Sequence, residues 1–108
     1  MVQGKLGQRT EIESFERKDN RTGEVIESRE KTEHTPEGRF WEPPAHITCG
    51  LSVTKNLGNY ESAKMTCQIT RPCVDRVEEH DRVWEEEKDW VSSKIDAEVS
   101  ALMDSPKE

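Results

Sequence analysis

The sequence predicts an α+β protein, in which a small antiparallel sheet carries one long C-terminal helix packed on one face. Residues 46–71 alternate strictly between apolar and polar side chains, and residues 75–103 repeat apolar side chains at helical spacing. A turn signal within residues 9–34 adds a second hairpin. We divide the single domain into an N-terminus, a charged hairpin or arm, a proline-rich connector, a core and a tail, at 1–8, 9–34, 35–45, 46–104 and 105–108.

The chain is very hydrophilic for its length of 108 residues. Only 31% of the residues are hydrophobic and 36% are charged, so any core must be thin. Small chains with thin cores often gain stability by assembly, so we expect a homo-oligomer. The sequence contains neither an apolar run of transmembrane length nor the apolar stretch of a signal peptide. We therefore expect a cytoplasmic protein without a membrane partner, with mostly reduced cysteines.

Negative charge is concentrated in the C-terminal third. The net charge is −7, and residues 76–108 contain 5 basic and 11 acidic side chains. An acidic chain is a poor candidate for strong non-specific nucleic-acid binding, which needs clustered Lys and Arg. The middle segment, 46–75, has 3 basic and 2 acidic residues and could still present a neutral or slightly basic face.

The N-terminal charged segment has two possible states. The sequence Asp19-Asn20-Arg21-Thr22-Gly23 favours a tight turn, and Ile-Glu-Ser occurs on both sides of it. This pattern predicts a solvent-exposed hairpin that joins a larger sheet. The alternative is a disordered arm, because so many charges with so few apolar residues cannot offset the entropy of ordering.

Three prolines mark the connector over residues 35–45. Pro36, Pro43 and Pro44 are expected to exclude regular structure there. Phe40 and Trp41 lie inside this segment, and they could close one end of the core or anchor a partner.

The central hairpin is the clearest pattern in the sequence. With a loop centred on Gly58, the expected pairs are Val53–Ala63, Leu51–Met65, Cys49–Cys67 and Ile47–Ile69. All of these apolar residues and cysteines then share one buried face. The other face is neutral and rich in hydroxyl groups. It could be an ordinary solvated surface, or it could hold single-stranded nucleic acid through an aromatic ring and a few cations.

One long helix is predicted over residues 75–103. Asp75 and Glu78 resemble a capping box. The expected apolar line is Val77, Trp84, Val91, Ile95 and Leu102, which places Trp84 against the hairpin. Trp90 lies off this line, so either the apolar face is wide or Trp90 belongs to a second surface for a partner. The acidic run around Glu85, Glu86 and Glu87 could be a solvated face or, together with Trp90, a partner-binding surface.

The residues with catalytic or metal-binding chemistry form no recognisable motif. Cys49, Cys67, Cys73 and His80 could bind zinc, but their spacing fits no paired short-knuckle pattern. A cross-strand disulfide and a reduced core pair are the alternatives for Cys49 and Cys67, and Cys73 is the thiol expected to be exposed. We expect no metal, no cofactor and no enzymatic activity.

The segment Gly50–Lys64, with its NLGNYESAK core, resembles a group of short, largely uncharacterised phage-encoded proteins suspected to assist DNA metabolism. The resemblance covers roughly residues 47–102 and implies a bacteriophage origin and the host cytoplasm. It directs attention to the hairpin residues Lys55, Asn56, Leu57, Gly58, Asn59, Tyr60, Glu61 and Lys64.

Two functions follow as hypotheses. In the first, the chain binds single-stranded DNA, or assists replication and recombination proteins. The candidate nucleic-acid-binding residues are Lys55, Asn56, Asn59, Tyr60, Lys64 and Arg71. In the second, it is an acidic inhibitor or adaptor, which could act against host defence, whose C-terminal helix binds a basic protein surface. The sequence leaves open the ligand, the number of subunits and whether residues 1–40 are ordered alone.

Overall fold

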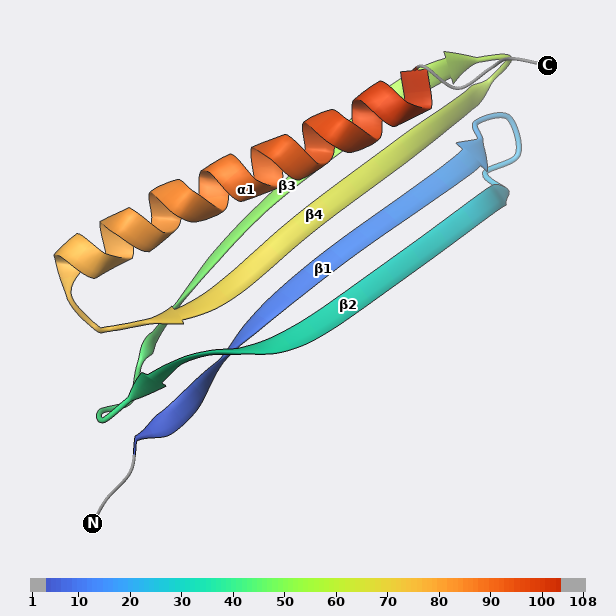
Figure 1. The fold of residues 1–108 in the computed structure, drawn as a ribbon. Coiled ribbons are helices and arrows are strands. Elements are labelled where there is room, and N and C mark those ends of the chain that lie inside the picture. Colours follow the sequence, from blue (N-terminus) through green and yellow to red (C-terminus); the bar gives the residue numbers. More distant parts are fainter. Residues whose placement is uncertain (1–3, 104–108) are drawn as a thin grey trace.

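The computed structural model describes residues 4–103 and confirms the predicted α+β architecture (Figure 1). Strands β1 (Lys5–Asp19), β2 (Val25–Phe40), β3 (Ala45–Gly58) and β4 (Glu61–Cys73) form one antiparallel sheet in the order β2-β1-β4-β3. Helix α1 (Val77–Met103) packs on one face, and the rod-like molecule measures 62 × 22 × 22 Å. Residues 9–34 thus form an ordered hairpin, and β1 begins within the segment predicted as a flexible N-terminus. The predicted tail, 105–108, lies outside the described residues.

The register of the central hairpin differs by two residues from the prediction. Cys49 pairs with Ile69, Leu51 with Cys67 and Val53 with Met65. A shift of two keeps every side chain on its predicted face, because strand side chains alternate with period 2. The apolar pattern therefore fixed the faces but could not distinguish registers that differ by two.

The turn between β3 and β4 explains this shift. Gly58 pairs with Glu61, so the loop consists of only Asn59 and Tyr60, which adopt positive φ angles of 52° and 63°. Two central residues with positive φ are typical of a type I′ turn. Gly58, at φ 82°, follows a bulge, and its N–H donates to Oδ1 of Asn56 over 2.9 Å. The predicted loop centre thus belongs to the end of a strand.

The proline-rich connector is shorter than predicted. Strand β2 continues through Pro36, which pairs with Gln8, and the link to β3 is confined to residues 41–44. The expectation that Pro36 excludes regular structure was wrong, because β2 is an edge strand. An edge strand tolerates proline where the missing N–H would face solvent.

The core lies between α1 and strands β3 and β4. It is formed by the buried side chains of Cys49, Met65, Cys67, Ile69, Val91 and Ile95. The buried helix stripe runs through Val83, Glu87, Val91 and Ile95 at four-residue steps. The predicted line through Val77 and Trp84 was wrong, since these side chains are 69% and 41% exposed. The helix also starts two residues later than expected, and Asp75 accepts a hydrogen bond from His80 in place of a capping box.

All three cysteines are free and buried. Cys73, predicted to be the exposed thiol, is buried at the end of β4, where strand β4 turns toward α1. Burial raises the pKa of Cys49 and Cys73, and it raises the pKa of Cys67 to about 11. The three thiols are therefore protonated at neutral pH, and each behaves as a small apolar side chain.

Candidate functional site

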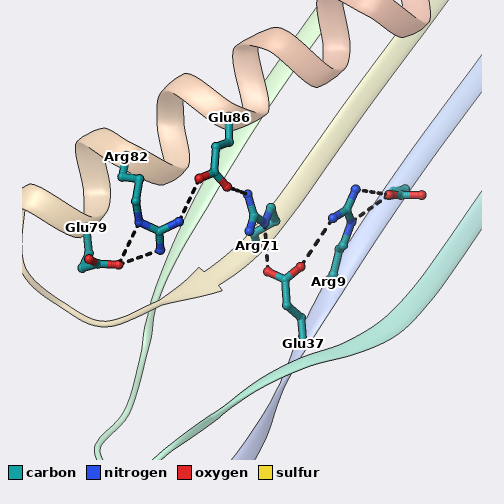
Figure 2. A network of polar contacts seen from close by, with 7 residues as sticks. Arg9, Glu37, Arg71, Glu79, Arg82 and Glu86 are labelled. Carbon is teal, nitrogen blue, oxygen red and sulfur yellow. Dashed lines mark hydrogen bonds and ion pairs between the residues drawn. The ribbon is translucent and has the colours of Figure 1, made fainter.

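A chain of alternating charges connects the helix to three of the four strands (Figure 2). Arg71 on β4 donates to Glu37 on β2 over 2.9 Å and to Glu86 on α1 over 2.8 Å. Arg82 also donates to Glu86, over 2.8 Å, and Arg9 lies 3.4 Å from Glu37. Glu79 and Glu11 complete the two ends of the network. These contacts hold α1 at a fixed position over the sheet.

Arg71 is the centre of this network. It was a candidate DNA-binding residue, but its side chain is only 16% exposed and faces two carboxylates. Burial disfavours its charge, yet the hydrogen bonds to Glu86 and Glu37 outweigh burial and raise its pKa above the ordinary value. The hydrogen bond from Arg71 in turn lowers the pKa of Glu86. Both groups are occupied within the chain.

Glu87 lies beside this network in the buried stripe of α1. Its side chain is 0% exposed, and neither carboxylate oxygen has a hydrogen-bond partner in the described part of the chain. Desolvation raises its pKa to about 7, although the positive charge of Arg71 partly opposes this. Glu87 therefore cannot contribute to the acidic partner-binding surface that the sequence suggested.

The outward face of α1 forms an acidic ridge, which consists of Glu78, Asp81, Glu85, Asp89 and Asp96. All five side chains are exposed, and successive members lie three, four or seven residues apart. Glu85 pairs with Lys88 over 3.2 Å. Within residues 4–103, no cation lies within 4.0 Å of the other four carboxylates. The ridge thus keeps most of its negative charge.

Two exposed apolar side chains lie beside this ridge. Val77 and Trp84 are seven residues apart, which places them about 20° from each other around the helix. Val77 is 69% exposed and Trp84 is 41% exposed. An exposed tryptophan next to unpaired charges is a typical composition for a protein-binding surface.

Trp90 belongs to its own chain's packing. Its ring is half-buried against the core, with the guanidinium of Arg9 at 5.7 Å and the ammonium of Lys94 at 5.4 Å from the ring centroid. Lys94 also lies 3.7 Å from Glu13 on β1. Of the two interpretations of Trp90, the structure shows the wide apolar face.

The candidate nucleic-acid residues are divided between the two faces of the sheet. Lys55 pairs with the buried Ala63 and lies, like Arg71, on the helix side. Lys55 and Arg71 therefore do not share the solvent-facing surface with Lys64, because odd-numbered residues of β3 and β4 face the helix. Lys64 and Asn56 lie on the opposite face, and Asn59 and Tyr60 lie at the turn.

The β1–β2 turn packs against the β3–β4 turn at one end of the sheet. We call this end, which contains Asn20, Arg21, Asn59 and Tyr60, the tip. The N–H of Asn20 donates to the carbonyl of Tyr60 over 2.7 Å, and Ser62 donates to Oδ1 of Asn20 over 3.0 Å. The guanidinium of Arg21 lies 5.0 Å from the Tyr60 ring centroid, and the tyrosine is 66% exposed. Sequence reasoning missed Asn20 and Arg21, because no local signal shows that two hairpin turns will meet.

The face of the sheet opposite α1 is open and rich in hydroxyl groups. The hydroxyls of Thr48 and Thr70 are 2.8 Å apart, and those of Ser52 and Thr66 are 3.2 Å apart. A shallow polar pocket of about 350 Å³ also lies at this sheet, lined in part by Lys64, Glu16 and Glu30. The two carboxylates balance the charges of Lys64 and of Arg29, which also lines the pocket, so this pocket has no net attraction for phosphate.

A second pocket lies between α1 and the uncovered half of the sheet. It measures about 260 Å³ and is lined by Phe15, Met65, Cys67, Ile95 and charged side chains of both strands and helix. Arg29 lies 4.6 Å from the Phe15 ring centroid. The pocket is a consequence of the helix covering only β3 and β4.

The described part of the chain contains no group of three or more His, Cys, Asp or Glu side chains arranged to hold a metal ion. None of its helices is both long and apolar enough to cross a membrane. Comparisons with protein-family models, curated proteins and solved structures find no match.

Proposed function

We propose that the chain is a non-enzymatic adaptor or inhibitor whose helix α1 binds a basic surface on another protein. The supporting observation is the exposed pair Val77 and Trp84 beside the acidic ridge. Trp84 would fill an apolar pocket on the partner, while the ridge would face Lys and Arg side chains around it. The buried, protonated thiols are poor nucleophiles, which agrees with a binding role.

The charge density favours a protein partner over general mimicry of DNA. Residues 4–103 have a net charge of −6 over 62 Å, or about one charge per 10 Å, against one per roughly 1.7 Å along duplex DNA. The ridge itself has a carboxylate about every 6 Å between Asp81 and Asp89, since four helical residues rise 6 Å. The negative field is therefore local to α1. The phage origin and a partner in DNA metabolism rest on the resemblance of the hairpin segment alone.

Quantitative capture from bacterial lysate tests this function. The bait is the wild-type chain, compared with Trp84→Ala and with the double variant Asp81→Lys/Glu85→Lys. Matched controls are Trp41→Ala, which removes another exposed tryptophan, and Glu16→Lys/Glu24→Lys, which makes the same charge change elsewhere. We expect a basic protein that both α1 variants lose and both controls retain. If no protein shows this pattern, α1 is not a binding surface.

Single-stranded DNA binding at the tip is the second candidate. The observation in its favour is Tyr60, an exposed aromatic residue held at positive φ and stacked beside Arg21. Within residues 4–103, no carboxylate lies within 4.0 Å of the ammonium groups of Lys18, Lys55 and Lys64 near this end. A strained, exposed aromatic residue is typical of a functional position.

A titration of labelled single strands at low salt tests whether the tip binds DNA. If the tip binds DNA, Tyr60→Ala and Lys64→Glu weaken binding, whereas Glu85→Lys does not. Absence of binding at low salt eliminates the tip as a DNA site. The same titration leaves the protein-binding proposal unaffected.

A further inference from the structure

Strand β2 lies at an edge of the sheet, so its outer side has no neighbouring strand, and α1 does not contact it. Residues 25–36 of β2 are all exposed. Helix α1 lies over β3 and β4, in the half of the sheet distant from β2. A second chain could therefore approach β2 without meeting a helix (Figure 1). An unpaired edge strand presents main-chain donors and acceptors for one more strand.

Main-chain hydrogen bonds show which residues face this edge. The N–H of Asp19 bonds toward the β2 side, at Glu24, and the N–H of Asn20 bonds toward the β4 side, at Tyr60. Odd-numbered residues of β1 thus bond to β2, because the direction alternates along a strand. Their partners on β2 are the odd-numbered Lys31 and Glu33. The N–H and C=O groups of Glu30, Thr32 and His34 consequently face the open edge.

The side chains of this edge are complementary in two antiparallel registers, one centred on Ser28, where Glu27 faces Arg29, and one centred on Thr32. The register centred on Ser28 pairs only residues 25–31 of β2, whereas the register centred on Thr32 pairs residues 25–39, nearly the whole strand. When Thr32 faces Thr32 of a second copy, each Lys31 faces a Glu33 and each Glu30 faces a His34. Centring the pair on Lys31 or Glu33 would place two like charges opposite each other. Pairing Arg29 with Lys31 would add Glu30 opposite Glu30 and Glu27 opposite Glu33. The register centred on Thr32 also places Glu27 opposite Glu37, but Arg9 and Arg71 already pair with Glu37 and offset its charge. Charged edges normally oppose pairing, and this register has the fewest uncompensated like charges among those that pair most of the strand.

We propose that two copies of this chain pair through β2 in the register centred on Thr32, forming a continuous eight-stranded sheet. The two-fold axis is perpendicular to the sheet, so both α1 helices lie on one face and the hydroxyl-rich surfaces join on the other. The occupant of the edge is a second copy because the charges match β2 itself. This goes beyond the proposed function and does not depend on it.

Disulfide trapping of the full chain tests the register directly. In the proposed pair, Thr32→Cys places two Cα atoms about 5.5 Å apart, within the range that a disulfide accepts. The control Ser28→Cys, on the same strand and face, would be opposite Pro36 and far from its own copy. We expect a cross-linked dimer from Thr32→Cys and none from Ser28→Cys under mild oxidation. Equal cross-linking of both, or none of either, overturns the register. The buried native thiols leave the new cysteine as the exposed one.

Sedimentation equilibrium tests the association itself. The wild-type chain is expected to sediment as a dimer, and a monomer at all concentrations overturns the proposal. Lys31→Glu should weaken the dimer at least about tenfold, since it creates two like-charge pairs. The exchange Lys31→Glu/Glu33→Lys restores both pairs and should recover dimerisation. Failure of this exchange to recover more than Lys31→Glu alone contradicts the assigned pairing.

Discussion

Arg71 on β4 donates to Glu86 on α1 over 2.8 Å, and this ion pair joins the helix to the sheet beside the buried Glu87. The same guanidinium reaches Glu37 on β2, so one side chain connects three elements. The network therefore determines how α1 lies across the strands, and with it the direction of the acidic ridge.

Replacing Arg71 by Met should lower the free energy of unfolding by about 2–4 kcal/mol, because Glu37 and Glu86 would remain close together without their cation. Urea denaturation at neutral pH measures this change. Arg82→Met is the matched control, since Arg82 is half-exposed and its surface ion pairs should contribute much less than the pairs of Arg71. Equal losses for the two variants would contradict the central position of Arg71.

Glu87 should make the protein less stable as pH rises. Its pKa is about 7 when folded, against an ordinary value of 4.5, so the folded state holds the proton more tightly. Below pH 4.5, Glu87 is protonated in both the folded and the unfolded state, and the free energy of unfolding is at its highest with respect to this group. It decreases as pH rises from 4.5 through 7. The loss amounts to about 3 kcal/mol over this window.

Urea denaturation of the wild type and of Glu87→Gln at pH 5 and pH 8 isolates this effect. The variant should lack the part of the pH dependence due to Glu87. Glu87→Met should be more stable than the wild type at pH 8, because it removes a buried charge without a hydrogen-bond partner. An unchanged pH dependence in Glu87→Gln would show that Glu87 is ionised or solvated at neutral pH.

The core and the exposed helix line should respond differently to truncation. Ile95→Ala removes a buried side chain and should cost about 2–5 kcal/mol. Trp84→Ala removes a larger side chain that is half-exposed, and it should cost less than about 1 kcal/mol in thermal or urea unfolding. A loss for Trp84→Ala as large as that for Ile95→Ala would mean that Trp84 belongs to the core.

The turn residue Tyr60 should be less than optimal for stability. A non-glycine residue in the left-handed region costs about 1 kcal/mol or more, so Tyr60→Gly should stabilise the hairpin despite the loss of the contact with Arg21. Tyr60→Ala loses the contact and keeps the strain, so it should be the less stable of the two. Melting temperatures of the three proteins check this order.

The sequence predicted the parts of the fold that depend on periodicity. Alternation over residues 46–71 assigned Met65, Cys67 and Ile69 to the buried face, and turn residues identified both hairpins. The register of the β3–β4 hairpin was predicted wrongly, because the identities of Asn59 and Tyr60 do not indicate a two-residue turn with a bulge beside it. The order of the strands also depends on pairing between β1 and β4, for which the sequence has no local signal.

The site was harder to predict than the fold. Glu87 lies four residues from both Val83 and Val91, so the helical repeat did contain the signal that its side chain is buried. That signal was outweighed by its acidic neighbours, which suggested a solvated run. The network of Arg9, Glu37 and Arg71 depends on contacts between strands distant in sequence, so charge patterning alone could not identify it.

The most direct test of the proposed role of α1 is the affinity of a captured basic protein for two variants with equal charge changes. Asp81→Lys/Glu85→Lys should weaken binding at least about thirtyfold relative to Glu16→Lys/Glu24→Lys, with the difference shrinking as salt increases. Equal affinities for the two variants at low salt would contradict binding through the acidic ridge of α1.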